Sequence, residues 1–287
     1  MSDALADNPR RTTLGRRIVI LGWAMLLALA TCLAGAAVIT VRGTFGVFIL
    51  GFWPLASLVA TVAVFVTYAL LVRLAEGRWP SELTLKGAGR ELGQGLALAI
   101  LAFGLLMGLL TLSGAIVWRP LASADWRWAL TNGLTQGAFG GLLLGLVAQG
   151  AIARLGSLAL LPVAGVVLAA LTAAWLVAPE WVLPPIQRVN AALGGAVLGL
   201  LWLRRRTLWL GLGLSMGWGA LSGAVIGSYA LDDSTEASIY EPGRGVLIAW
   251  LKGTEGPEAS IMLLAGCVLA VAFLTWRAWK EGCFSRA

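Results

Sequence analysis

The sequence predicts an all-α fold, a polytopic bundle of about eight transmembrane helices with both termini cytoplasmic. The composition is the first reason: 59% of the 287 residues are hydrophobic and only 12% are charged, whereas soluble domains carry about 25% charge. The second is a mean hydropathy of +0.86, which arises from repeated apolar runs long enough to cross ~30 Å of hydrocarbon. The third is the distribution of basic residues, because 15 of the 21 Lys and Arg fall in alternate loops on one side.

The predicted helices are apolar stretches separated by short polar segments. None contains an acidic residue, and the only basic one is Arg188, at the start of the sixth. The first run follows Arg16 and Arg17 and exceeds the apolar core of a signal peptide, so we interpret it as a membrane anchor. The sixth run is short, which leaves a tilted or partly re-entrant segment open. The predicted ranges are 18–41, 46–72, 94–118, 129–152, 156–178, 187–203, 207–230 and 259–276.

These ranges give one transmembrane domain, 18–276, between cytoplasmic tails at 1–17 and 277–287. The longest outer loop, 231–258, is mainly acidic. The basic runs are therefore interpreted as topology signals and contacts to anionic lipid, and not as nucleic-acid sites. We expect a multi-pass protein of the bacterial cytoplasmic (inner) membrane, a plasma membrane.

Glycine is frequent, with 37 residues, and it recurs at four-residue spacing on two predicted helices. Small residues at this spacing let helix backbones approach closely in lipid. We therefore expect the fourth and seventh helices to pack in the interior of the bundle. The glycines concerned are Gly133, Gly137, Gly141 and Gly145 on the fourth helix, and Gly219, Gly223 and Gly227 on the seventh.

Several kinds of chemistry lack the residues that they need. The chain has no histidine, and its three cysteines have no metal-like spacing, so neither a metal nor a cofactor is expected. A serine nucleophile lacks a base, and an aspartyl protease lacks paired carboxylates within the spans.

Polar residues within the spans are the remaining candidates. Asn132, Thr135 and Gln136 share one face of the fourth helix, and Ser215 and Ser222 lie one heptad apart on the seventh. Two interpretations stay open: a polar cavity between these helices, or hydrogen bonds that only join them.

Three stretches, in order, resemble the CPBP family of CAAX-protease and bacteriocin-processing intramembrane metalloproteases, also called the Abi family. Thr207–Gly219 (TLWLGLGLSMGWG) is similar to the family's third motif region, and Gly253–Ser260 (GTEGPEAS) to a segment before its last helix. Arg73–Gly108 fits a basic cytoplasmic loop that leads into a glycine-containing helix. The resemblance covers about residues 70–276 and implies an intramembrane protease fold.

The catalytic residues of that family do not carry over. Its first motif is a double glutamate followed by an aromatic residue and an arginine-glycine pair, of which only Phe139 and Gly141 match. Its second motif, a phenylalanine and a histidine, aligns with Leu171 and Trp175. Zinc needs Cys, His or carboxylate ligands, so the resemblance implies a pseudoenzyme. The family's catalytic positions are occupied by Thr135, Gln136, Gly140, Trp175, Ser215 and Gly219.

We therefore expect a non-catalytic scaffold, assembly or accessory subunit that binds a transmembrane helix of another membrane protein. The alternative is lipid, isoprenoid or pigment binding or transport in the remodelled cavity, with tryptophans stacking on the ligand. A less favoured alternative is residual CAAX-type activity, with Glu255 and Glu258 as the carboxylates. The candidate cavity residues are Asn132, Gln136, Trp175, Ser215 and Trp218.

Overall fold

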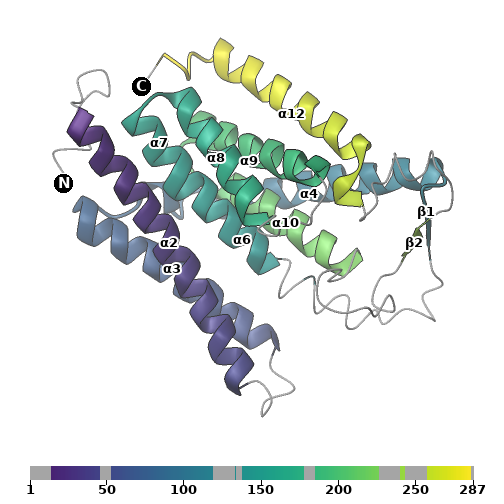
Figure 1. The fold of residues 1–287 in the computed structure, drawn as a ribbon, viewed down its shortest axis with the longest axis horizontal. Coiled ribbons are helices and arrows are strands. Elements are labelled where there is room, and N and C mark those ends of the chain that lie inside the picture. The colour runs from purple at the N-terminus through teal and green to yellow at the C-terminus, as the bar shows by residue number, and fades with distance from the viewer. Residues whose placement is uncertain are drawn as a thin grey trace.

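The protein is a bundle of apolar helices (Figure 1). The computed structural model describes residues 14–45, 53–118, 133, 138–177, 185–225, 240–242 and 257–285. All eight predicted helices are present in this part of the chain. Seven are α2 (Leu14–Phe45), α3 (Trp53–Glu76), α4 (Ala88–Leu112), α8 (Pro162–Val177), α9 (Pro185–Arg205), α10 (Trp209–Val225) and α12 (Ile261–Lys280).

The remaining helix, the fourth in the order of the chain, is a composite. It runs from α6 (Ala138–Gly145) through a π-helical segment, η6 (Leu146–Ala153), into α7 (Arg154–Ala159). The junction residues Gly145 and Arg154 keep helical φ and ψ angles, so the three segments form one rod. A π-helical segment widens a helix locally and often marks a functional or strained site.

The helices have the length and surface of membrane-spanning segments. Among the described residues, five helices are long and apolar enough to cross a membrane, and two shorter apolar helices accompany them. Large apolar side chains cover their outer faces; Leu101 of α4 is 69% exposed and Leu269 of α12 is 70% exposed. A water-soluble domain would bury such a stripe, so these exposed apolar faces indicate a membrane protein.

The helix boundaries correct four expectations. The third helix begins and ends six residues earlier than predicted, and the sixth is a regular helix of 21 residues. Acidic residues also occur within helices: Glu76 ends α3 and Glu91 lies in the first turn of α4. Arg154, predicted to lie in a loop, is inside the composite rod. A prediction based on apolar runs ends each helix at a charged residue. The helix itself continues through that residue when its charge has a partner.

The rods pack around two apolar clusters. The larger joins α2, α3, α6, η6, α7, α8, α9, α10 and α12. The smaller joins α4 to β1, and side chains of α10 and α12 pack against it. The pairs α4–α10, α8–α9, α6–α10 and α9–α12 are in extensive contact, and α2 and α3 lie together at one side of the bundle (Figure 1).

The two ends of the bundle are built differently. At one end, the segment with η3 (Ser81–Leu83) meets the turn between α9 and α10, because the amide of Leu208 donates to the carbonyl oxygen of Glu82 at 3.2 Å. At the other end, the strands β1 (Ile116–Trp118) and β2 (Tyr240–Pro242) pair antiparallel (Figure 1). A short helix, η8 (Pro257–Ala259), precedes α12.

Candidate functional site

The interface between α6 and α10 is a close backbone contact. A Cβ atom on Gly141 would collide with the carbonyl oxygen of Ser215, and one on Gly145 would collide with the Ser215 hydroxyl. Gly133 lies equally close to the backbone of α10 at Ala220. The small residues thus bring the two helices together as small-residue stripes do in lipid. Gly219 and Gly223 are half-buried, and Gly137 and Gly227 lie outside the described residues.

The polar groups that the structure describes at this interface, Ser215 and Gln149, are buried. Ser215 is 8% exposed, and its hydroxyl donates to the carbonyl oxygen of Gly211, in its own helix, at 2.9 Å. Gln149 on η6 is fully buried against Gly211. Neither polar atom of its amide has a hydrogen-bond partner within the described part of the chain. Around these two residues the described side chains pack closely, and Gln149 was not among the predicted cavity residues.

The two candidate tryptophans lie on different helices, Trp175 on α8 and Trp218 on α10. Trp175 is 71% exposed on α8, so it faces outward and does not fill an internal cavity. Trp218 packs edge-to-face on Phe103 of α4, with ring centroids 5.3 Å apart. The resemblance led to the prediction for Trp175, but α8 turns that position toward the outside. Asn132, Thr135 and Gln136 lie outside the described residues, and Gly140 is exposed.

The outer-loop carboxylate Glu258 has a structural partner. It accepts a hydrogen bond from the Ser222 hydroxyl, and its carbonyl oxygen accepts one from the Asn190 amide at 2.8 Å. These bonds fasten η8 to α9 and α10. Glu255 lies outside the described residues. In the part of the chain that the structure describes, no group of three or more Cys, Asp or Glu side chains could hold a metal ion.

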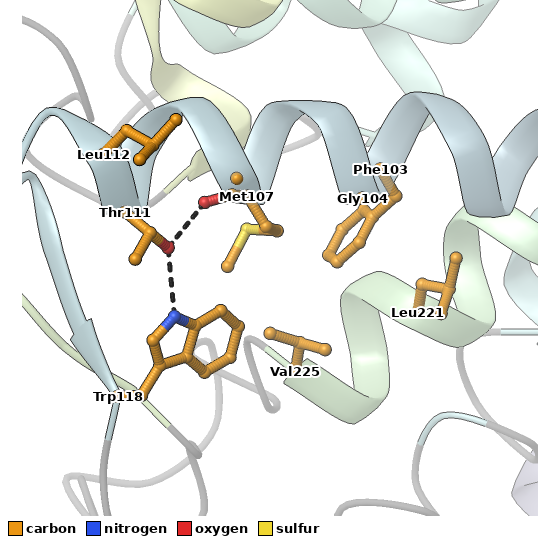
Figure 2. Close-up of a pocket in the computed structure, with 9 residues that line it drawn as sticks. Phe103, Gly104, Met107, Thr111, Leu112, Trp118, Leu221 and Val225 are labelled. Atoms are coloured by element: carbon orange, nitrogen blue, oxygen red, sulfur yellow. Dashed lines mark hydrogen bonds between the residues drawn. The ribbon is translucent and has the colours of Figure 1, made fainter.

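An open apolar groove of about 530 Å³ lies between α4, β1 and the end of α10 (Figure 2). Its one polar pair is internally satisfied: the Trp118 indole donates to the Thr111 hydroxyl at 3.0 Å, and that hydroxyl donates to the Met107 carbonyl oxygen at 2.7 Å. The groove therefore presents an apolar wall. It is lined by Phe103, Gly104, Met107, Gly108, Thr111, Leu112, Trp118, Leu221 and Val225.

The floor of this groove continues along the outward face of α4. Gly104 and Gly108 are four residues apart, and Gly93 and Ala97 repeat the spacing one segment earlier on the same face. All four residues are exposed, and a Cβ on any of the three glycines would meet nothing within 4 Å. On the opposite face of α4, Gly95 packs tightly against α10. One face of α4 is thus occupied within the bundle, and the other is open.

A buried ionic cluster at the end with η3 is the feature that the sequence analysis missed. Arg154, 4% exposed, makes two bonds with Glu76: Nη1 to Oε2 at 2.8 Å and Nη2 to Oε1 at 2.6 Å. Its Nε donates to the carbonyl oxygen of Gly150 at 2.8 Å and lies 3.4 Å from Glu82 Oε1. The Tyr68 hydroxyl donates to Glu82 at 2.8 Å.

The cluster is closed by two further donors. Arg78 reaches Glu76 and Glu82 at 2.8 and 2.9 Å, and the Trp23 indole donates to Glu76 at 3.2 Å. Two carboxylates and two guanidinium groups balance in charge. Burial would raise the pKa of Glu82, but Arg154 and Arg78 outweigh it and hold that pKa below its usual value. The cluster joins α2, α3 and η3 to α7. Because its charged groups are paired with one another, we interpret it as a structural network that stabilises the fold.

Comparisons with protein-family models, with curated proteins and with solved structures found no match for this chain.

Proposed function

We propose that this chain is a non-catalytic membrane protein that binds a transmembrane helix of a partner protein, as a scaffold or accessory subunit. The observation that carries the proposal is the open face of α4. Gly93, Ala97, Gly104 and Gly108 present small residues outward in two pairs of four-residue spacing.

Such a face suits a helix better than it suits lipid alone. Lipid gives no hydrophobic drive for helix association, so tight van der Waals packing between backbones has to supply it. At Gly104 and Gly108 the bare backbone also forms part of the groove between α4, β1 and α10. A partner helix crossing there would contact the backbone of α4 and place a side chain in the groove.

The non-catalytic part of the proposal is supported by the residue inventory. The chain has no histidine, and the positions of the resembled protease motifs carry residues that cannot ligate zinc. On these grounds we propose that the chain is a catalytically inactive relative of the CPBP family in the bacterial cytoplasmic membrane, with both termini inside.

A lipid or isoprenoid chain in the groove is the second candidate. The groove's volume of about 530 Å³ is in the range of small-molecule sites, and its lining is apolar with one tryptophan at its edge. This location differs from the cavity predicted around Trp175 and Ser215.

The test is native mass spectrometry of the chain extracted gently from its own membrane. The variant Gly104→Leu/Gly108→Leu fills the open face, where added side chains meet no protein atom within 4 Å of Cβ. Gly22→Leu/Gly266→Leu is the matched control, because these glycines of α2 and α12 are equally open.

We expect a stoichiometric polypeptide partner with the native chain and the control, and its loss in the α4 variant. A partner retained by both variants would place the interface elsewhere. A defined small molecule in place of a polypeptide would favour the second candidate.

A further inference from the structure

Three consecutive arginines, Arg204, Arg205 and Arg206, lie at and just after the end of α9. The structure gives two of them, Arg204 and Arg206, defined side-chain contacts. Arg204 makes a two-point bond with Glu281 beyond α12, from Nε at 3.0 Å and from Nη2 at 2.6 Å. Arg205 and Arg206 are exposed. The cluster therefore has a fixed edge and two cations that face outward.

Arg206 adopts a backbone conformation that glycine usually supplies. Its φ is +58°, in the left-handed region that side-chain-bearing residues rarely enter. Its amide donates to the carbonyl oxygen of Trp202 at 2.8 Å and so closes the helix end. Its guanidinium carbon lies 4.6 Å from the centroid of the Trp202 ring, a cation–π contact that orients the charge.

The end of α12 adds further cations to the same place. Arg277 shares the Glu281 carboxylate with Arg204, at 3.3 Å, and Lys280 lies 4.2 Å above the ring of Trp276. Five cations thus converge with two carboxylates, Glu281 and Glu91, the latter bonded to Thr207. The excess is positive.

The position of the cluster along the helices points to the headgroup layer. The apolar candidate spans Pro185–Arg205 and Ile261–Lys280 both end here. Trp276 and Trp279, 46% and 71% exposed, are interfacial anchors of the kind found at membrane boundaries. Below the cations, the exposed apolar side chains of Leu269 and Phe273 continue along α12.

We propose that the arginine cluster formed by the ends of α9 and α12 binds the phosphate headgroup of an anionic phospholipid. Arg205 and Arg206 contact the phosphate oxygens, and Arg204 and Arg277, held by Glu281, form the rim. The acyl chains lie against the apolar outer face of α12. Guanidinium groups suit phosphate because their donors match its geometry, and anionic headgroups are the ligands available at this level.

The test titrates purified full-length chain with phosphatidylglycerol or phosphatidylcholine and counts bound lipid by native mass spectrometry. Arg205→Gln/Arg206→Gly removes two charges, and glycine at position 206 keeps the left-handed backbone without strain. Arg73→Gln/Lys86→Gln is the matched control, since it removes two exposed cations of the α3 and η3 region.

We expect phosphatidylglycerol to bind the native chain and the control equally, and the arginine variant about tenfold or more weakly. Phosphatidylcholine should bind weakly to all three. Equal losses in both variants would reduce the site to diffuse surface charge and overturn the proposal. Inorganic phosphate or glycerol phosphate competing at the lipid's own concentration would assign the site to a soluble anion and overturn it as well.

Discussion

At the scale of single residues, Arg154 is a buried charge that depends on its partners for stability. A guanidinium with 5% of its side chain exposed loses most of its hydration, and only close partners offset that loss. Glu76, Glu82 and the carbonyl oxygen of Gly150 supply them, and Tyr68 and Trp23 complete the carboxylates' hydrogen bonds. A network of this kind gains little over an apolar core, but it is costly to break.

Removing Arg154 alone should therefore destabilise the protein strongly. Arg154→Met leaves two carboxylates buried without their main cation, and we expect a loss of about 3–5 kcal/mol in the free energy of unfolding. Denaturant titration of the detergent-solubilised chain measures it. Arg73→Met, an exposed arginine on α3, should cost less than about 1 kcal/mol. A combined Arg154→Met/Glu76→Gln variant should cost less than the two single losses added together.

The same network predicts how stability depends on acidity. Because the folded protein lowers the pKa of Glu82, this carboxylate adds stability at neutral pH. That contribution disappears as the pH falls through the lowered value, below the ordinary range near 4.3. The native chain should lose stability there, and Arg154→Met should lose much less. An identical acid profile for the two would remove Arg154 as the cause.

The sequence could not reveal this cluster because hydropathy separates apolar runs from charged ones. Glu76 and Glu82 lie in a segment rich in arginine, which was interpreted as a solvated cytoplasmic loop, and Arg154 fell between two predicted helices. The one available signal was a single arginine among the small and apolar residues of 151–157. Assigning its partners needs the tertiary structure.

At the scale of elements, the close approach of α6 and α10 depends on which glycine faces the partner helix. Gly140 and Gly141 are neighbours, but a Cβ would meet nothing within 4 Å at the first and the Ser215 carbonyl oxygen at the second. Sequence spacing predicted the stripe that includes Gly141. Only the packing of α6 on α10 shows that Gly141 contacts α10 and Gly140 does not.

This pair gives a controlled experiment with one methyl group. Gly141→Ala forces α10 to shift, and overpacking of this kind costs about 1–3 kcal/mol. Gly140→Ala should be neutral or stabilising by up to about 1 kcal/mol, because alanine favours a helix over glycine. Thermal unfolding in one detergent compares them. Equal effects of both variants would mean that backbone contact does not limit this interface.

Helix positions were largely predictable, whereas helix faces were not. The apolar runs located all eight helices, since crossing hydrocarbon constrains length and composition together. Trp175 shows where that information ends: its exposed position on α8 is fixed by the packing of α8 on α9. A run that is apolar all round carries too little periodicity to show which side faces the bundle.

For the whole molecule, the two ends of the bundle differ in character: one is charged and the other presents an apolar groove. The end with η3 carries the ionic cluster and the arginine cluster, and the other end carries β1, β2 and the groove. In Figure 1, α2 begins and α12 ends on the same side of the bundle, away from the strands. Two ends on one side of the bundle are what the proposed even number of crossings requires.

The last prediction is which end of the bundle faces the cytoplasm. α4 has 25 residues, about 37 Å at 1.5 Å per residue, so Lys86 and Ser113 flank its opposite ends, and both are exposed. In a chain whose three cysteines are replaced by alanine, we expect Ser113→Cys to react with an impermeant maleimide on intact cells. Lys86→Cys should react only after permeabilisation, because the positive end stays inside. The reverse pattern would invert the topology and move the arginine cluster to the outer leaflet, and labelling of both on intact cells would show that α4 does not cross the membrane.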